Sequence, residues 1–447
     1  MLGPIKYFIK LISIPIFYFG SFITAYMTVF KEAKWGLLLL VFLLPQPNIF
    51  YKFHGLPFGK DIIDILFFAV LFGIMVQRKG FDRGFNTKLI VFFVIVYYIA
   101  LWNSTLRFSL PLPLTTANEL LRDWKNFALM AFLYLLVVNV VKDEDDQKTF
   151  TLLISVVILF ISIRCFRDFT AGDSFRWDKR VNGPFEVVGL GSNHLGAFIA
   201  DYCSVILGLL LFDKNLKRRC LYISTVLFGL HPLFFSYSRG AYIAYLGSIS
   251  FFGLMKKRSL LVLVIVLLLT WQTVLPVSVV DRIMMTRNEQ GEIENSAAGR
   301  IELWEFAIKL FDTNPIFGVG YGGYALSVGG LELSSGAVVQ AGFDSHNFWV
   351  KILGEQGIIG ATLFSLIIWR AFRSGFVLYR LANTDFHRGL GFGFMGCVIA
   401  LAISNLFGDR WSYLSLGAYF WILWGLVDSA IRSTKNEDAT NTMPKVA

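Results

Sequence analysis

Long apolar runs alternate with short polar segments along almost the whole chain. A membrane-spanning helix needs about 20 mostly apolar residues, and thirteen runs approach that length. The first run contains Pro15 and Gly20, so it could lie at the membrane interface, and the pattern predicts an all-α, polytopic membrane protein with about twelve or thirteen transmembrane helices. The candidate segments are residues 8–30, 35–50, 62–77, 88–102, 117–141, 149–166, 192–212, 219–237, 240–255, 259–277, 347–369, 389–407 and 411–431.

One polar stretch, residues 278–346, is far longer than the usual connection of 2–8 residues between packed helices. It divides the chain into N-terminal transmembrane helices (1–277), a long periplasmic loop with short helices (278–346) and C-terminal transmembrane helices (347–432). The polar residues 433–447 are predicted to form a disordered cytoplasmic tail. Because long loops often carry function, we expect the functional residues on the side of the membrane where this loop lies.

The basic residues predict the orientation of these helices. They cluster after every second apolar run, and such clusters mark the cytoplasmic side of a membrane protein. The clusters are Lys31 with Lys34, Arg78–Lys88, Lys142 with Lys148, Lys214–Arg219, Lys256–Arg258 and Arg370–Arg388. The loops at 167–191 and 278–346 are therefore expected on the opposite, outer face.

The composition agrees with a membrane protein and excludes other classes. Of the 447 residues, 55% are hydrophobic and 16% are charged, whereas soluble domains carry about 25% charged residues. The net charge of +10 does not indicate nucleic-acid binding, because the basic residues lie in short clusters between apolar runs. The cysteines lack metal-ligand spacing, and the first apolar run lacks a small-residue cleavage site, so we expect neither a metal centre nor a removable signal peptide.

The sequence Ser238-Arg239-Gly240 stands between two apolar runs with almost no loop. An arginine at that depth is costly unless an anionic or polar group meets it. Arg239 is therefore a candidate phosphate ligand. The alternative is a side chain that extends to the membrane interface without a ligand.

A second candidate arginine lies in the long loop. Residues 301–311 place apolar side chains at helical spacing, and Asn314-Pro315 is expected to end that helix. Arg300 is expected at the start of the helix, where backbone N–H groups favour anions. The following GVGYGG, residues 318–323, has no preceding strand and no Walker lysine, so it does not indicate a nucleotide site.

The stretch DSHNFWVKILGEQGIIG places a histidine where an apolar run begins. Asp344 or Ser345 is expected to cap a helix that starts near His346. A histidine in a first helical turn is disfavoured as imidazolium by the helix dipole, so His346 would be neutral and able to accept a proton. Lys351 and Glu355, one turn apart, are expected to pair. The alternative for His346 is a structural role at the membrane edge.

Other polar residues at the outer ends of the apolar runs are possible cavity-lining groups. For Asn193 and His194, which stand at the entrance of an apolar run, a role as helix caps remains open as well. These residues are Arg180, Asn193, His194, Asn347 and Arg410.

Three of these stretches together resemble the O-antigen ligase and polymerase family of bacterial enzymes. They are SRG between two membrane segments, GR…LW…NPIFGVGYG in a long outer loop, and HNFWVKILGEQGIIG at the start of the next segment. The resemblance covers roughly residues 180 to 410 and rests on the order, spacing and topology of short motifs. Ser192-Asn193 stands where the family often has a proline-asparagine pair.

The resemblance implies a metal-independent glycosyl transfer from undecaprenyl diphosphate at the periplasmic face of the inner membrane. Arg239 and Arg300 would bind the diphosphate, and His346 would activate the acceptor hydroxyl. The implied partners are the undecaprenyl-diphosphate-linked glycan, an acceptor glycan or lipid A core, and membrane lipids, with no nucleic acid and no cofactor. A ligase, which transfers the finished glycan, is favoured by a narrow margin over a polymerase, which joins lipid-linked repeats.

Two other classes remain as alternatives. A metal-dependent, lipid-linked glycosyltransferase would place acidic residues in the first outer loop, where Asp61 and Asp64 lie. A flippase or transporter would line a cavity with charges deep in several helices, whereas most charges here lie at the edges of the apolar runs.

Overall fold

The computed structural model describes residues 3–77, 81–169, 174–285 and 295–442 of the chain. Helices form almost all of its regular structure. Within the described ranges there is no strand, and one isolated antiparallel bridge pairs Glu332 with Val338 in the long loop. The predicted all-α class is therefore confirmed.

The first half of the chain forms the α-helices α1–α7 and the short 3-10 helices η1–η4. These elements are α1 (Gly3–Phe30), α2 (Lys34–Leu43), α3 (Pro47–Phe50), η1 (Tyr51–Phe53), η2 (Gly59–Asp61), α4 (Ile62–Gln77), α5 (Thr87–Arg107), α6 (Glu119–Val140), α7 (Glu144–Asp168), η3 (Trp177–Lys179) and η4 (Gly183–Val188).

The second half contains the elements that hold the candidate site. They are α8 (Ser192–Leu210), α9 (Leu216–Phe235), α10 (Arg239–Met255), α11 (Arg258–Val274), α12 (Val277–Met284), α13 (Asn295–Thr313), α14 (Gly323–Ser327), α15 (Phe348–Leu381), α16 (Asp385–Ser404) and α17 (Leu414–Thr442). Helix α17 continues past Ser433, where the sequence predicts the chain to become disordered, and residues 443–447 lie outside the described residues.

Every one of the thirteen predicted segments coincides with a helix, with α2 and α3 sharing one segment. Among the described helices, seven are long and apolar enough to cross a membrane, or up to nine if each of two bent helix pairs is one span. This confirms a polytopic membrane protein. The count is lower than the predicted twelve or thirteen because helices such as α4, with 16 residues, and α10, with 17, are shorter than a full span.

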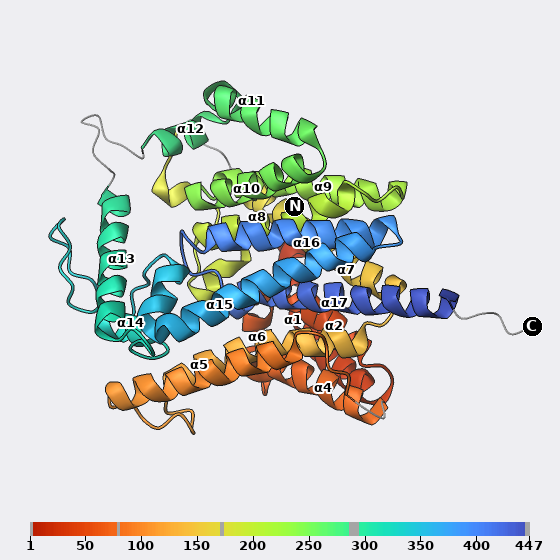
Figure 1. Ribbon diagram of the computed structural model, residues 1–447, viewed down its shortest axis with the longest axis horizontal. Coiled ribbons are helices and arrows are strands. Elements are labelled where there is room, and N and C mark those ends of the chain that lie inside the picture. The colour runs from red at the N-terminus through yellow and green to blue at the C-terminus, as the bar shows by residue number, and fades with distance from the viewer. Residues whose placement is uncertain (1–2, 78–80, 170–173, 286–294, 443–447) are drawn as a thin grey trace, which may run out of the picture.

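The long helices α5, α15, α16 and α17 run side by side along the length of the bundle (Figure 1). Helix α16 packs between α8 and α15, and α17 packs on α6. Helices α13 and α14 lie at one end of the bundle, and the C-terminus leaves the opposite end. The long loop is thereby held over the ends of α5 and α15.

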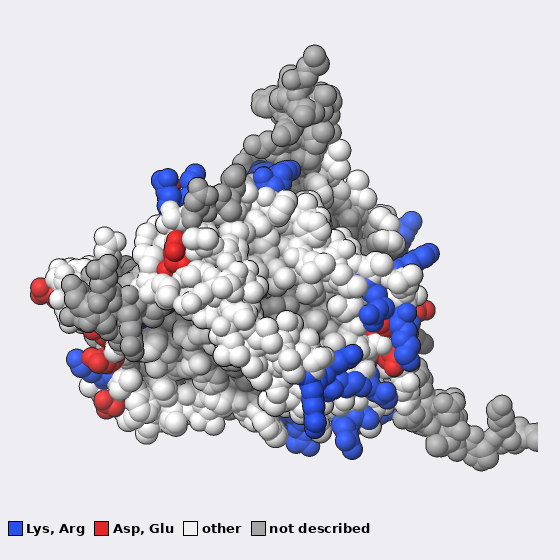
Figure 2. All heavy atoms as spheres, turned by 90° about the horizontal axis from the view of Figure 1, so that it is seen from above, with Lys and Arg blue, Asp and Glu red and all other residues white. Residues whose placement is uncertain are grey.

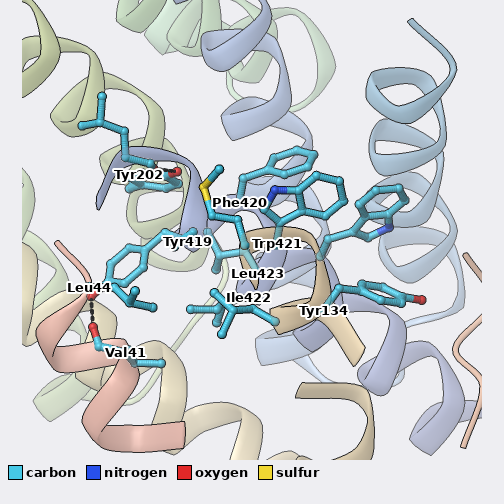
Figure 3. Close-up of a cluster of buried hydrophobic side chains, with 14 of the residues drawn as sticks. Val41, Leu44, Tyr134, Tyr202, Tyr419, Phe420, Trp421, Ile422 and Leu423 are labelled. Atoms are coloured by element: carbon cyan, nitrogen blue, oxygen red, sulfur yellow. Dashed lines mark hydrogen bonds between the residues drawn. The ribbon is translucent and has the colours of Figure 1, made fainter. Parts of the chain in front are cut away.

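Aromatic side chains of α17 fill the centre of the bundle. Figure 3 shows the run Tyr419–Leu423 between Tyr202 of α8, Tyr134 of α6 and Val41 of α2. The Tyr419 hydroxyl donates a hydrogen bond of 2.6 Å to the carbonyl oxygen of Val41. A buried hydroxyl in an apolar bundle is costly unless it is paired, so this bond fixes α2 against α17.

Helix α15 is broken at Gly357, whose φ of 61° and ψ of −158° are not helical. This conformation is nearly restricted to glycine. The glycine-rich turn of the long loop docks on the break, where the Gly320 N–H donates to the Glu355 carbonyl at 2.7 Å. A Cβ added to Gly318 would lie 2.3 Å from the backbone carbonyl carbon of Glu355. These glycines therefore allow close contact with α15, in agreement with the expectation that GVGYGG is not a nucleotide loop.

Charged side chains are unevenly placed along the bundle. On the face shown in Figure 2, most Lys and Arg side chains gather toward the end from which the C-terminus leaves, and a broad uncharged band separates them from the other end. Together with Figure 1, this places α13 and α14 at the end opposite the main basic clusters. The arrangement agrees with the expectation from the sequence that the basic clusters and the long loop lie on opposite sides.

This orientation predicts the labelling of two single cysteines. Ser335 in the long loop and Lys257 before α11 are both exposed. In a background whose four native cysteines are replaced, Ser335→Cys should react with a membrane-impermeant thiol reagent in intact spheroplasts, and Lys257→Cys should react only after lysis. Lys214→Cys, in another basic cluster, is the matched control and should behave like position 257. Labelling of position 257 from outside would overturn the orientation.

Candidate functional site

A polar pocket of about 390 Å³ opens at the N-terminal end of α8. We call it the arginine pocket. It is formed by η3, the turn before α8 and the first residues of α8, so the segments 177–182 and 191–194 supply all its walls. Its lining residues are Trp177, Asp178, Arg180, Asn182, Gly191, Ser192, Asn193 and His194.

Arg180 connects this pocket to the junction between α9 and α10. Its guanidinium donates to the Asn193 side-chain oxygen at 2.7 Å and to the Ser236 carbonyl oxygen at 2.7 and 3.0 Å. It also lies over the Trp177 ring, 5.5 Å from the ring centre. Arg180, Asn193 and His194, predicted as cavity-lining, therefore share one pocket, and Arg180 is held there by well-defined contacts.

Four arginines surround this region. Burial, together with the nearby Arg282, Arg300 and Arg239, lowers the pKa of Arg180 to about 10, although Tyr242 opposes this shift. The guanidinium remains charged at neutral pH. Like charges this close repel one another, so an anion bound among them would relieve the repulsion.

The two predicted diphosphate ligands differ in their local positions. Arg239 is the first residue of α10, and the Ser238 side chain caps that helix by accepting from the Ala241 N–H. Arg300 lies in the second turn of α13, because this helix begins at Asn295 rather than next to Arg300. The expectation that Arg300 stands at a helix start is therefore wrong, whereas Arg239, for which no such expectation was made, does stand at one. The predicted end of α13 before Asn314-Pro315 is confirmed.

Sequence reasoning missed Arg282 in α12. Its side chain is only 5% exposed and its guanidinium carbon lies 4.5 Å from the Trp177 ring centre and 5.2 Å from that of Phe175. Such stacking holds a guanidinium plane in place. The sequence does contain a signal for Arg282, because an arginine stands in a short amphipathic segment directly after an apolar run. A second signal is that the other long loop, at 167–191, is rich in aromatic residues.

His346 lies two residues before α15, in a left-handed backbone conformation with a φ of 55°. This conformation is uncommon for a residue other than glycine. The cap of α15 is Asn347, whose side-chain oxygen accepts from the N–H groups of Trp349 and Val350. The expected cap at Asp344 or Ser345 is therefore wrong, and so is the placement of His346 in the first helical turn.

The environment of His346 still favours a neutral ring. Burial of the imidazole lowers its pKa below the ordinary value, and Arg300 and Arg410 lower it further. Asp344 opposes this effect, with its carboxylate oxygen 3.7 Å from Nδ1. Burial, and not the helix dipole, is therefore the main cause of the lowered pKa of His346. The imidazole is able to accept a proton near neutral pH.

The remaining two candidates have different roles. Arg410, in the α16–α17 connection, is 5% exposed, and its charge acts on both His346 and His194. Burial lowers the pKa of Arg410 as well. Asn347, predicted as cavity-lining, uses its side-chain oxygen for the helix cap described above. The structure thus brings Arg180, Asn193, His194, Arg239, Arg300, His346 and Arg410 to one end of the bundle.

Residues 203–365 of the chain match the family described as O-antigen ligase. The match supports an assignment of the chain to the O-antigen ligase and polymerase family. It includes Arg239, Arg300 and His346, and it confirms the resemblance seen in the sequence. No curated protein matches the chain. Members of this family are glycosyltransferase-like enzymes, and the described helices make this chain a multi-pass membrane protein.

A second pocket of the protein lies beside the first. We call it the acidic pocket; its volume is about 380 Å³, and it lies between α5, α6, α14, α15 and the α16–α17 connection. The His194 ring of the arginine pocket contacts the Tyr413 ring of the acidic pocket, with 5.5 Å between ring centres. Its polar lining residues are Tyr97, Asp123, Asn126, Tyr321, Lys351, Glu355, Gln356, Asp409, Ser412 and Tyr413.

Lys351 does not form the expected pair with Glu355. Among the described ion pairs, its ammonium group lies 2.8 Å from Asp409 and 3.7 Å from Asp344. The Glu355 carboxylate instead accepts from the Tyr324 N–H at 3.3 Å. Asp409 was not predicted, because it is brought to Lys351 from a connection 58 residues further along the chain.

The described residues contain no group of three or more His, Cys, Asp or Glu side chains that could hold a metal ion. Of the two acids considered for a metal-dependent family, Asp64 forms an ion pair with Lys125 at 2.5 Å, and Asp61 lies in η2.

Proposed function

We propose that this protein transfers a glycan from undecaprenyl diphosphate to an acceptor hydroxyl at the periplasmic face of the inner membrane. The observation that carries the proposal is the arginine cluster next to the half-buried His346, whose pKa is lowered by desolvation and by Arg300 and Arg410. Positive charge suits a diphosphate leaving group, and a neutral imidazole suits a hydroxyl nucleophile. The two chemical requirements of the transfer therefore meet at one end of the bundle.

The arginines act on the donor. Guanidinium groups bind phosphate oxygens in pairs. When the bond between the anomeric carbon and the phosphate oxygen breaks, its electron pair moves onto the diphosphate, and fixed positive charges stabilise the developing charge. A diphosphate is already a good leaving group, so no general acid is needed.

His346 acts on the acceptor. A sugar hydroxyl is a weak nucleophile at neutral pH, and a positioned base assists it by taking its proton. The proton moves to an imidazole nitrogen of His346 as the acceptor oxygen bonds to the anomeric carbon. Asp344, 3.7 Å from Nδ1, stabilises the imidazolium that results. The proton of the acceptor hydroxyl thus ends on His346, and the electron pair of the broken bond ends on the diphosphate.

The arginines make a divalent metal unnecessary in this mechanism. Transfer by the purified protein should therefore continue in excess EDTA at a rate within about twofold of the untreated rate, which corresponds to less than about 0.5 kcal/mol. The measurement is glycan transfer in detergent or liposomes, with a Mg²⁺-reconstituted sample as the control. Loss of transfer on chelation, restored by Mg²⁺ or Mn²⁺, would refute the mechanism and bring Asp61 and Asp64 forward.

The ligase form of the reaction is our first choice, because the motifs of the long loop are regular. Its acceptor would be a lipid A core, whereas a polymerase would use a second lipid-linked repeat. The deciding experiment offers both acceptors to the reconstituted protein with one labelled undecaprenyl-diphosphate-linked glycan. Label in the lipid A core product supports the ligase, and label in a two-repeat, lipid-linked product supports the polymerase. A transporter would move the label across the membrane without either product.

A further inference from the structure

The acidic pocket has no role in the mechanism derived so far. We propose that it binds the sugar of the acceptor that carries the attacking hydroxyl, and that it selects a neutral or amino sugar over an anionic one. This proposal rests on the proposed glycosyl transfer and assigns a separate site to its second substrate.

The charge of the pocket excludes the donor diphosphate. Its lining contains the carboxyl groups of Asp123, Glu355 and Asp409 but one basic side chain, Lys351. Lys351 already lies 2.8 Å from Asp409. A diphosphate would therefore meet net negative charge in the acidic pocket, whereas beside the arginine pocket Arg239, Arg282 and Arg300 lie close to Arg180. This difference in charge favours the donor diphosphate near the arginines and the acceptor in the acidic pocket.

The chemistry of the lining suits a carbohydrate. Carboxylates and amides accept hydrogen bonds from sugar hydroxyls, and the rings of Tyr97, Tyr321 and Tyr413 offer apolar faces to sugar C–H groups. The volume of about 380 Å³ lies within the range of small-ligand sites. A lipid chain would not suit this lining, because it would bury several polar groups without partners.

Two side chains support a ligand directly. Tyr97 and Gln356 both line the pocket, and both residues are more than nine-tenths buried. The two side chains lie close to each other, but within the described part of the chain neither the Tyr97 hydroxyl nor the Gln356 side-chain oxygen forms a well-aligned hydrogen bond. Buried polar groups are normally paired, so these two are ready to bond with hydroxyl groups of a ligand.

The pocket also lies where the base can reach its occupant. Gly342 and Phe348, which flank His346 in the chain, are both lining residues. Asp344 bridges the two sites: one carboxylate oxygen lies 3.7 Å from His346 Nδ1 and the other 3.7 Å from Lys351 Nζ. Asp344 therefore connects His346 to Lys351 of the acidic pocket lining, and the arginine pocket lies next to the acidic pocket.

The test measures acceptor and donor kinetics separately in reconstituted protein. The donor is the labelled undecaprenyl-diphosphate-linked glycan, and the acceptors are lipid A core and the repeat-unit oligosaccharide without lipid or diphosphate. Asp123 is half-exposed at the pocket, with a side chain 56% accessible, so Asp123→Asn should fold normally. Glu119→Gln, an exposed acid one turn earlier on α6 and outside the lining, is the matched control.

We expect Asp123→Asn to raise the acceptor KM about tenfold, the effect of losing one hydrogen bond to a charged group, with an unchanged donor KM. Tyr97→Phe should raise the acceptor KM without lowering the melting temperature, because its hydroxyl forms no well-aligned hydrogen bond within the described residues. Glu119→Gln should match the parent. An unchanged acceptor KM in both pocket variants, or a raised donor KM, would overturn the proposal. Absence of transfer to either acceptor by the parent protein would instead refute the proposed function.

Discussion

Replacement of His346 by alanine is expected to lower kcat for glycan transfer by about 10²–10⁴, the usual contribution of a positioned general base. Donor KM should change little, because the arginines remain in place. The measurement is single-turnover transfer with the purified, monodisperse variant. His54→Ala, a histidine in the connection before α4, is the matched control and should keep the parent rate. Near-normal transfer by His346→Ala would remove His346 from the mechanism.

The same assignment predicts the pH dependence of the reaction. A base acts in its deprotonated form, and burial with the nearby Arg300 and Arg410 lowers the pKa of His346 below its ordinary value of 6.5. The value of kcat/KM should therefore be constant above pH 7 and fall only as the pH drops through a point below 6.5. A half-loss of activity above pH 6.5 would show that burial does not control the group that titrates.

The positions of the helices could be predicted from the sequence because apolar runs identify membrane helices one segment at a time. The local motifs also pointed to Arg239, Arg300 and His346. The backbone at His346 could not be predicted, because Asp344, Ser345 and Asn347 are all plausible caps and only the packing of the loop decides among them. Asn347 is the cap, and the histidine is left outside the helix.

Contacts between residues far apart in the sequence account for the other features of the site that the sequence did not predict. Arg282 of α12 stacks on Trp177, more than 100 residues earlier in the chain, and no local pattern records such a pair. Lys351 had a neighbouring acid one turn away, yet its close partner is Asp409. The break at Gly357 turns the Glu355 region toward the glycine-rich turn. The separation of two pockets by charge follows from these long-range contacts.

The arginine cluster makes the second large prediction. Arg239→Lys and Arg300→Lys keep the positive charge but lose the paired contact with phosphate oxygens. Each should raise the donor KM about 10- to 100-fold, the range expected for hydrogen bonds to a charged group. The measurement is donor titration at saturating acceptor, together with direct binding of the labelled lipid diphosphate. The acceptor KM should stay at the parent value, since the acidic pocket is intact.

A control variant distinguishes donor binding by the arginine cluster from attraction by any positive charge at the outer face. Arg107, at the end of α5, is exposed and donates a hydrogen bond of 2.5 Å to the Asn314 side chain rather than joining the cluster around Arg180. Arg107→Lys should therefore leave donor KM unchanged. If Arg239→Lys and Arg300→Lys bind the donor as well as the parent does, the cluster does not hold the diphosphate. If Arg107→Lys weakens binding equally, the attraction is a property of the whole surface and not of four arginines brought together by α10, α12, α13 and the turn before α8.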